Sequence, residues 1–361
     1  FLRNSLLKNK PNPFSKFNSQ PMKFPFSIKI AAFLVLLFGV HCGGFAQNGT
    51  TFLQFEGKEG PGKGKHIVLV AGDDEYRSEE SMPMLAKLLS EKHGFKTTVL
   101  FPIEPNTGNV VPNHQNNIPG LEHLKTADLM IMLIRFRELP DEQTKHIEDF
   151  LKAGKPIIGL RTSTHAFAYQ KNKTSPYFKW TWNGKEAGWE KGFGKVIFGE
   201  TWVNHHGIHA KEGCRALIDG VQEMNDHPIL RGVNDIWVPE DVYGIQSLPE
   251  NATVLIHGQS TAGMNDKAPV MWEKSVMPIA WTKPYQLEGG KPGMAFASTM
   301  GSSMGFQSED LRRLMVNASF YLLGMAETIT PDLSVEIVGE YKPTMFGFDT
   351  FRKGMKVADF K

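Results

Sequence analysis

The sequence predicts an α/β domain with a mostly parallel sheet that is covered by helices on both faces. Between residues 66 and 160, segments with the apolar spacing of strands alternate with segments that have the spacing of helices. The strand segments are also continuous apolar runs, which is typical of parallel strands because both of their faces are buried. These two observations together favour a layered domain with one hydrophobic sheet at its centre.

The elements follow from local signals. The run "HIVLVAG" (66–72) predicts a buried strand, and "SMPMLAKLLSEKHG" (81–94) predicts a helix with Pro83 in its first turn and Gly94 as its C-terminal cap. The last helix has Ser308 as its N-terminal cap. Further strands are predicted at 95–101, 128–134, 155–160, 252–258, 277–282 and 293–299, and further helices at 140–154 and 308–324.

The N-terminal segment is expected to be removed. Residues 1–21 precede the first methionine and are interpreted as upstream translation, and residues 22–46 have the basic, apolar and small-residue parts of a secretory signal. The apolar run of this signal is shorter than the ~20 residues of a membrane span. A lipoprotein anchor at Cys42 is the alternative. Residues 47–65 are predicted to be a linker, 66–326 the main domain, and 327–361 an extension that packs on it.

Charge and cysteine content exclude several functions. Without residues 1–46, which carry six basic residues and no acidic one, the chain has 34 basic and 38 acidic residues, a formal charge of −4. This balance predicts no nucleic-acid partner. Only Cys214 remains, so an internal disulfide is excluded. We expect a periplasmic or extracellular protein without a stable membrane span. A homodimer stays open.

The strand ends carry the candidate binding residues. Ligands of open parallel sheets bind outside the carboxyl ends of the strands, and three of these ends carry arginine. Arginine suits carboxylates, hydroxyls or a developing enolate but does not transfer protons, so the acid/base role falls to His165 or to the carboxylates after the first strand. The residues at these ends are Asp73, Asp74, Glu75, Tyr76, Arg77, Arg135, Arg137, Arg161, Ser163 and His165.

Two later segments add further candidates. The histidines of "GETWVNHHGIH", His205, His206 and His209, suit a divalent metal, although loop histidines that only form hydrogen bonds are the alternative. Four of the seven tryptophans, Trp202 among them, lie within 180–202. Their rings favour stacking on a sugar, and a buried aromatic cluster under a long loop is the alternative. No cofactor other than such a metal is predicted.

Eight segments together resemble the ThuA-like (trehalose-utilisation) family, which is similar in fold to class I glutamine amidotransferases. The resemblance covers about residues 66–326. It implies a flavodoxin-like three-layer domain and a role in sugar catabolism linked to 3-keto-glycosides. The segments are "HIVLVAGDDEYRSEE", "IRFRELPDEQ", "GLRTSTHAF", "FGETWVNHHG", "DHPILRG", "PEDVYG", "PIAWT" and "RRLMVNASFYLLGM".

The resemblance also bears on individual residues. Amidotransferases carry a cysteine nucleophile on the turn after the strand at 155–160, whereas this chain has Arg161 there, with His165 one turn further on. The usual family histidine position corresponds to Arg161, and whether His165 replaces it stays open. Amidotransferase activity is therefore not expected. The family's acid-and-tyrosine segment corresponds to Glu240, Asp241 and Tyr243, and "PIAWT" contributes Trp281.

The leading hypothesis is an exported enzyme that isomerises, cleaves by elimination or hydrolyses a sugar or 3-keto-glycoside by acid/base chemistry. In this hypothesis His165 moves protons with Asp74 or Glu240 as the partner carboxylate, and Arg161 stabilises negative charge. The three histidines His205, His206 and His209 could add a metal as Lewis acid, and the remaining candidates named above bind the carbohydrate substrate. Two alternatives stay open: a carbohydrate-binding accessory protein without catalysis, and a metal-dependent hydrolase of another small substrate.

Overall fold

The computed structural model describes residues 49–218 and 226–361. The predicted leader at 1–46 lies outside the described residues. Within them, one ten-stranded sheet has the order β1-β3-β2-β6-β7-β12-β11-β10-β8-β9. The strands are β1 (Phe52–Phe55), β2 (His66–Gly72), β3 (Lys96–Leu100), β6 (Leu129–Ile134), β7 (Ile157–Leu160), β8 (Gly213–Leu217), β9 (Trp237–Val238), β10 (Thr253–Thr261), β11 (Met277–Tyr285) and β12 (Gly293–Ser298).

The predicted fold class is confirmed. The five central strands β3, β2, β6, β7 and β12 are parallel to one another. The pairs at both ends of the sheet are antiparallel. A separate small pair joins β4 (Ile103–Glu104) to β5 (Asn109–Val110). The sheet is thus mixed, with a parallel centre that places several strand ends along one edge.

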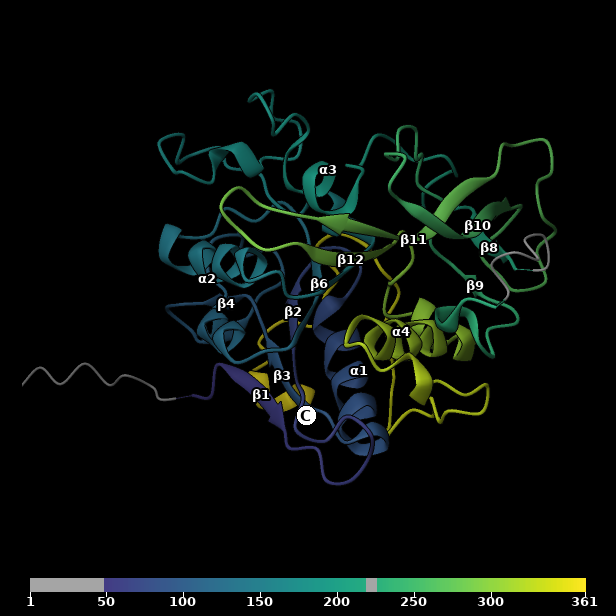
Figure 1. The fold of residues 1–361 in the computed structure, drawn as a ribbon, viewed down its shortest axis with the longest axis horizontal. Helices are drawn as coiled ribbons and strands as arrows, with labels where there is room; N and C mark the ends of the chain where they lie inside the picture. Colours follow the sequence, from purple (N-terminus) through teal and green to yellow (C-terminus); the bar gives the residue numbers. More distant parts are fainter. Residues whose placement is uncertain (1–48, 219–225) are drawn as a thin grey trace, which may run out of the picture. The chain divides into compact units, whose positions relative to one another are not determined.

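Helices cover both faces of the parallel strands. The side chains of Ile67 and Leu69 on β2 pack in one apolar cluster with α1 and α4, whereas Val68 and Val70 pack in a second cluster with η1 and α2. Figure 1 shows α1 and α4 together on one side of these strands and α2 on the other. The helices are α1 (Ser78–His93), α2 (Asp141–Lys152), α3 (Gly192–Phe198) and α4 (Glu309–Leu322), with short 3₁₀ turns η1 (Leu121–Lys125), η2 (Arg161–His165), η3 (Phe178–Trp180), η4 (Pro228–Leu230), η5 (Gly305–Gln307), η6 (Ala326–Thr328) and η7 (Val357–Phe360).

Helix α1 begins three residues earlier than predicted, so Pro83 lies inside it rather than in its first turn. The early start has a local cause. The Ser78 hydroxyl accepts hydrogen bonds from the backbone nitrogens of Gly72 and Asp73, which fixes the turn between β2 and α1. The other end is as predicted, because Gly94 has a left-handed φ of 80° and its nitrogen caps the last turn. The Ser308 cap of α4 is also present.

The segment at 47–65 is not only a linker. Its residues 52–55 form β1, which pairs antiparallel with β3 at the edge of the sheet. Leu53 of this strand is buried. Gly- and Lys-rich residues follow this short apolar stretch directly, so the sequence pattern did not predict a strand there. Strands β8 and β9 and helix α3 were likewise not predicted.

The C-terminal extension packs on the domain through specific polar contacts. Tyr341 Oη donates to the carbonyl of Ser303 at 2.7 Å. The Thr344 nitrogen donates to Glu80 at 2.7 Å, and the Gly347 nitrogen donates to the Glu75 carbonyl at 3.0 Å. The extension therefore reaches the loop that follows β2. Among the described residues, no helix has the length and apolar content that would let it cross a bilayer.

Glu79 in the first turn of α1 predicts a measurable pH dependence. It is buried, and neither carboxyl oxygen has a hydrogen-bond partner among the described residues. Burial raises its pKa from 4.5 to about 8, and the charges around it are Arg77, Glu80 and Asp73. Because the folded state retains a proton that the unfolded state loses, this group's contribution to stability is complete below pH 4.5 and is lost as pH rises towards 8.

We therefore expect Glu79→Gln to stabilise the protein at pH 8 by about 2 kcal/mol or more, at ~1.4 kcal/mol per pKa unit, and to give less than about 1 kcal/mol at pH 5. Urea unfolding of both proteins at the two pH values measures this difference, because all other titrating groups are shared. An equal difference at both pH values would contradict the assignment.

Candidate functional site

The carboxyl ends of β2, β6 and β7 meet at one edge of the sheet, as predicted. The loop after β2 carries Asp73 to Arg77, the end of β6 leads to Arg135, and β7 runs directly into η2 at Arg161. Two segments that do not belong to these strand ends complete the site. They are the loop 205–209 before β8 and the stretch 240–243 after β9.

Arg161 stands on a strained turn. Its φ is 41°, in the left-handed region that non-glycine residues rarely adopt. Its guanidinium is completely buried and turned inwards: Nη1 donates to the carbonyls of Asp241 and Thr299, and Nη2 donates to Tyr76 Oη at 2.9 Å. The carbon of the guanidinium also lies 4.0 Å from the centre of the Tyr243 ring. Arg161 is therefore committed to internal contacts.

Arg161 does not have its predicted role of stabilising negative charge, because it pairs with a carboxylate of the protein. Its Nη2 lies 3.0 Å from Asp241 Oδ1, and both side chains are fully buried. Burial alone would raise the pKa of Asp241, but the charge of Arg161 and the hydrogen bonds of His205 and His209 hold it below its usual range. Arg161 thus keeps Asp241 ionised instead of stabilising negative charge on a substrate.

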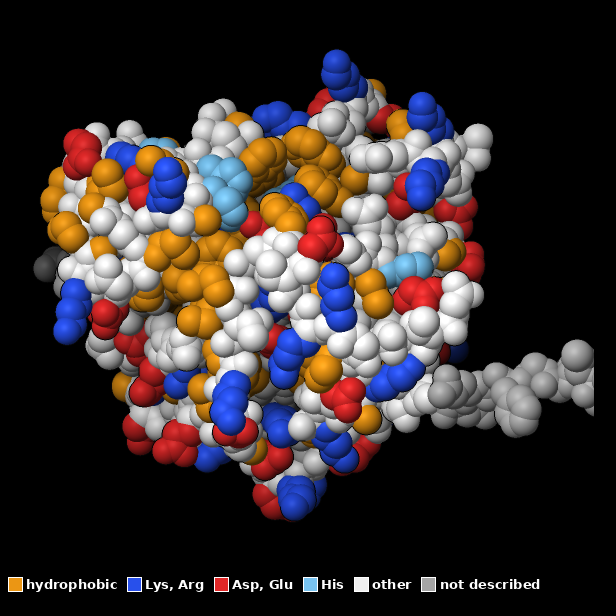
Figure 2. All heavy atoms as spheres, turned by 180° about the vertical axis from the view of Figure 1, so that it is seen from behind, with side chains coloured by type: hydrophobic (Ala, Val, Ile, Leu, Met, Phe, Trp, Pro, Cys, Tyr) orange, Lys and Arg blue, Asp and Glu red, His pale blue; other side chains and the backbone are white. Residues whose placement is uncertain are grey.

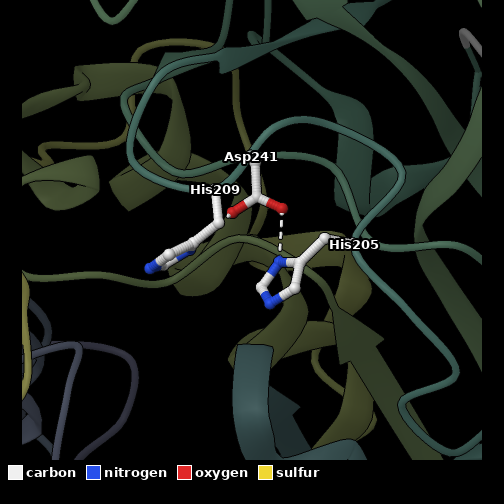
Figure 3. Close-up of side chains that lie close together, drawn as sticks. All are labelled: His205, His209 and Asp241. Atoms are coloured by element: carbon white, nitrogen blue, oxygen red, sulfur yellow. Dashed lines mark hydrogen bonds and ion pairs between the residues drawn. The ribbon is translucent and has the colours of Figure 1, made fainter.

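Two imidazoles share the Asp241 carboxylate. His205 Nδ1 lies 2.7 Å from Asp241 Oδ2, and His209 Nδ1 lies 3.2 Å from Oδ1. Figure 3 shows the two rings on either side of the carboxylate. The side chains of His205 and His209 are about one-third exposed at 34% and 33%, whereas that of Asp241 is fully buried. The arrangement is a buried anion with two histidines that solvent can reach.

The backbone explains why these residues meet. The nitrogens of His206 and Gly207 both donate to the Val242 carbonyl, which holds the histidine loop against the segment that carries Asp241. A side chain at Gly207 would place a Cβ 2.9 Å from that of Asp241. Glycine is required there because the two backbones approach so closely.

The predicted metal ligands are only partly together. His206 points away, with Nε2 2.7 Å from the Ser275 carbonyl, so it does not belong to the cluster. Asp241 takes its place: a nitrogen of His205, a nitrogen of His209 and an oxygen of Asp241 all lie within 4.8 Å of one another. The sequence pattern missed this set because Asp241 is more than thirty residues from the loop, as the separation of 32 from His209 shows.

Glu75 contacts the second nitrogen of His209. Its Oε1 lies 2.9 Å from His209 Nε2, and the Glu75 side chain is 5% exposed. Burial raises the pKa of Glu75 to about 6, and the hydrogen bond to Asp241 raises the pKa of His209 above its ordinary 6.5. His209 therefore lies between two carboxylates.

His165 is less accessible than its predicted role requires. It is 3% exposed, and burial lowers its pKa well below the ordinary value, so the ring is neutral. Aromatic rings surround it, with Trp202 at 5.7 Å and Phe136 at 5.0 Å between ring centres. His165 therefore packs among aromatic side chains beneath the site, and a ligand does not reach it directly.

Several predicted site residues have structural roles. Glu240 is buried and accepts hydrogen bonds from the Gly301 and Ser302 nitrogens and the Ser302 hydroxyl, so it orders that turn and does not face the cluster. We therefore correct its predicted catalytic role. The same applies to buried residues whose polar atoms bond to the protein itself: Asp73 to the Tyr76 nitrogen and Thr162, Arg77 to Gly347, Arg137 to the Pro112 and His114 carbonyls, Ser163 to the Met132 carbonyl and Trp281 to the Phe198 carbonyl.

The rim of the site is aromatic. Asp74 forms an ion pair of 2.9 Å with Arg135, whose guanidinium lies between the rings of Phe136 and Phe348. Phe348 comes from the C-terminal extension and is 50% exposed. Figure 2 shows a face of the molecule on which histidine side chains lie beside hydrophobic ones around a hollow. The sequence pattern predicted only that the extension packs on the domain, so it did not identify Phe348 as a residue of the site. The only signal for such a role was an aromatic pair around a glycine, "FGF".

A family model described as ThuA, trehalose utilisation, matches residues 67–322. The chain belongs to the ThuA family. Solved ThuA-like proteins from Parabacteroides merdae and Bacteroides uniformis are 12% and 15% identical to it, with TM-scores of 0.45 and 0.42. Each match includes 98% of the solved chain, and the two matches include 79% and 77% of this chain.

An exo-β-1,4-mannosidase, Op5Man5, from an Opitutaceae bacterium shows a further likeness at 10% identity and a TM-score of 0.32, over 73% of this chain and 36% of that one. No curated protein matches the chain. The ThuA family name associates the protein with carbohydrate utilisation, and the low structural scores add nothing about its chemistry.

In this ThuA-family chain the one described cysteine does not lie on the turn that carries Arg161. Cys214 lies on β8 and is 2% exposed, and the strands β12, β11 and β10 separate β8 from β7, the strand that leads into Arg161. Burial raises the pKa of its thiol far above the usual range. A thiolate nucleophile is therefore not available at the position where amidotransferases need one.

Proposed function

We propose that the protein is an exported enzyme of carbohydrate catabolism that modifies a sugar or an oxidised sugar, such as a 3-keto-glycoside, by acid/base chemistry. The reacting centre in this proposal is the cluster of His205, His209 and Asp241. The observation that carries it is the pairing of one buried, ionised carboxylate with two imidazoles that solvent reaches. A carboxylate that orients an imidazole is a recurrent device for proton transfer and for stabilising charge on oxygen.

Neighbouring residues supply the features of a sugar site. Trp202 lies edge-on to His205, with 5.5 Å between the ring centres, and it also contacts Trp182 at 5.8 Å. Such aromatic faces stack on the apolar faces of sugar rings. The Asp74–Arg135 pair at the rim adds charged groups that can bind hydroxyl or carbonyl oxygens. A ligand between these walls would present its oxygens to the histidines.

Conversion of a panel of 3-keto-disaccharides by the purified chain, followed by NMR, tests the proposal. We expect turnover that His209→Ala abolishes and that His206→Ala leaves unchanged, because His206 bonds to Ser275 outside the cluster. No conversion of any member of the panel, or equal turnover by both variants, would refute it.

A second candidate is a carbohydrate-binding protein without catalysis. The observation that favours it is an apolar pocket of about 410 Å³ beside the cluster, lined by Trp182, Trp202 and Thr201 among others. This pocket offers stacking surface but none of the cluster's titratable groups.

Trp202→Ala is expected to weaken sugar binding about tenfold or more, since a stacked aromatic ring contributes ~1–2 kcal/mol. Trp272→Ala is the matched control, because Trp272 is 70% exposed and does not line the pocket. Titration calorimetry measures both. Binding that survives Asp241→Asn with no turnover in the wild type would favour the non-catalytic candidate.

A further inference from the structure

We propose that His205, His209 and Asp241 form a binding site for a divalent transition-metal ion such as Zn²⁺. The inference deepens the proposed function, and it rests on that proposal only in placing the reaction at this cluster. The set differs from the three neighbouring histidines that the sequence suggested, because His206 is replaced by a carboxylate from a distant segment.

The donor atoms have the spacing that a small coordination sphere needs. In a tetrahedral site with bonds of ~2.0–2.1 Å, neighbouring donor atoms lie roughly 3.3 Å apart. His205 Nδ1 lies 2.7 Å from Asp241 Oδ2 and His209 Nδ1 lies 3.2 Å from Asp241 Oδ1, and one donor atom from each of the three residues lies within 4.8 Å of the others. Small side-chain rotations therefore bring them to one metal ion. Two imidazole nitrogens and one carboxylate oxygen are ligands that Zn²⁺ and similar ions prefer.

The groups behind these donors are those that support metal ligands in proteins. A histidine that binds a metal commonly donates its other N–H to a carboxylate, and this fixes the tautomer. His209 has this arrangement, since Nδ1 faces Asp241 and Nε2 lies 2.9 Å from Glu75 Oε1. Asp241 is likewise held from behind by Arg161.

Glu75 provides a separate observation. Its Oε1 is buried and lacks a hydrogen bond of proper geometry among the described residues, although His209 Nε2 is close. A metal ion on Nδ1 leaves the single ring proton of His209 on Nε2, and a small rotation of the ring would direct that proton at this oxygen. Metal binding would thus give Glu75 Oε1 a hydrogen bond, and a buried acceptor without one destabilises the folded protein.

Access to the site indicates a reactive rather than a purely structural ion. Structural zinc sites have four protein ligands, whereas catalytic ones have three and keep a position for water or substrate. Three protein ligands meet here, and both histidines are about one-third exposed, at 34% and 33%. An ion in this place would polarise a carbonyl or hydroxyl oxygen of a sugar whose ring stacks on Trp202.

Metal binding by the full chain tests the inference without any substrate. After treatment with EDTA and removal of the chelator, the protein is titrated with Zn²⁺, Mn²⁺ or Co²⁺ by calorimetry, and bound metal is counted by elemental analysis. We expect one equivalent for the wild type and for His206→Ala. His205→Ala, His209→Gln and Asp241→Asn should each lower the affinity at least about 100-fold. Circular dichroism identifies any variant that fails to fold.

The outcomes separate this inference from the proposed function. Less than a tenth of an equivalent with every ion, or wild-type affinity in folded His209→Gln, overturns the metal site. Turnover of a keto-glycoside that persists in EDTA would overturn the metal's role while leaving acid/base catalysis intact. Stoichiometric metal in a protein that converts no sugar would support the site and refute the proposed function, in favour of a metal-dependent hydrolase of another substrate.

Discussion

Arg161→Leu is expected to lower the free energy of unfolding by about 3–5 kcal/mol, the effect of removing one partner from a buried ion pair. The guanidinium is completely buried and contacts Asp241, Thr299 and Tyr76. Leucine fills part of the volume but leaves the Asp241 carboxylate without its cation, in a place that water does not reach. Chemical denaturation monitored by tryptophan fluorescence measures the change.

Two further variants give this prediction its controls. Arg215→Leu removes an arginine whose partner Asp235 is 61% exposed, so it should cost less than about 1 kcal/mol. Arg161→Leu combined with Asp241→Leu should destabilise the protein less than the two single effects added together, because no unpaired charge is left buried. A double variant whose destabilisation equals the sum of the two single effects would show that Arg161 and Asp241 do not stabilise each other.

Asp241→Asn is expected to reduce kcat/KM for the sugar substrate by about 100-fold or more. An amide cannot accept hydrogen bonds on both sides, so it cannot orient His205 and His209 together. Disturbing the carboxylate that fixes a catalytic imidazole causes losses of ~10⁴-fold in the best-known triad. Steady-state kinetics on the keto-glycoside that the wild type converts measures the effect.

Asp235→Asn is the matched control for this substitution. Asp235 is exposed, pairs with Arg215 and lies outside the cluster, so its kinetics should equal those of the wild type. Activity in Asp241→Asn that stays within a factor of three of the wild type would remove this carboxylate from the reacting centre.

The parallel part of the fold was predictable because its signals are local. Each central strand is an apolar run that burial on both faces requires, and caps such as Gly94 and Ser308 mark helix ends through their own backbone or side-chain chemistry. Strands β1, β8 and β9 gave no such signal. They are short, and they are strands only because a neighbour offers each an edge: β3 for β1, β10 for β8 and β8 for β9.

The candidate site was predictable in place but not in detail. The strand-end rule located Asp74, Glu75 and Arg135 correctly at one edge. It could not show that Arg161 turns inwards, because this depends on an Asp241 that is 80 residues away. The residue type also does not distinguish a carboxylate that contacts two imidazoles from one that orders a turn, as Asp241 and its neighbour Glu240 demonstrate.

The contact between the C-terminal extension and the loop after β2 has a consequence for biosynthesis. Gly347 bonds to the Glu75 carbonyl and accepts from Arg77, across a separation of 270 residues. A ribosome adds ~5–20 residues per second, so the loop that carries Glu75 emerges many seconds before the residues that hold it in place. This loop therefore acquires its final support only when translation is nearly complete, and prematurely terminated chains would carry the whole sheet without the contacts that hold Glu75 and Arg77.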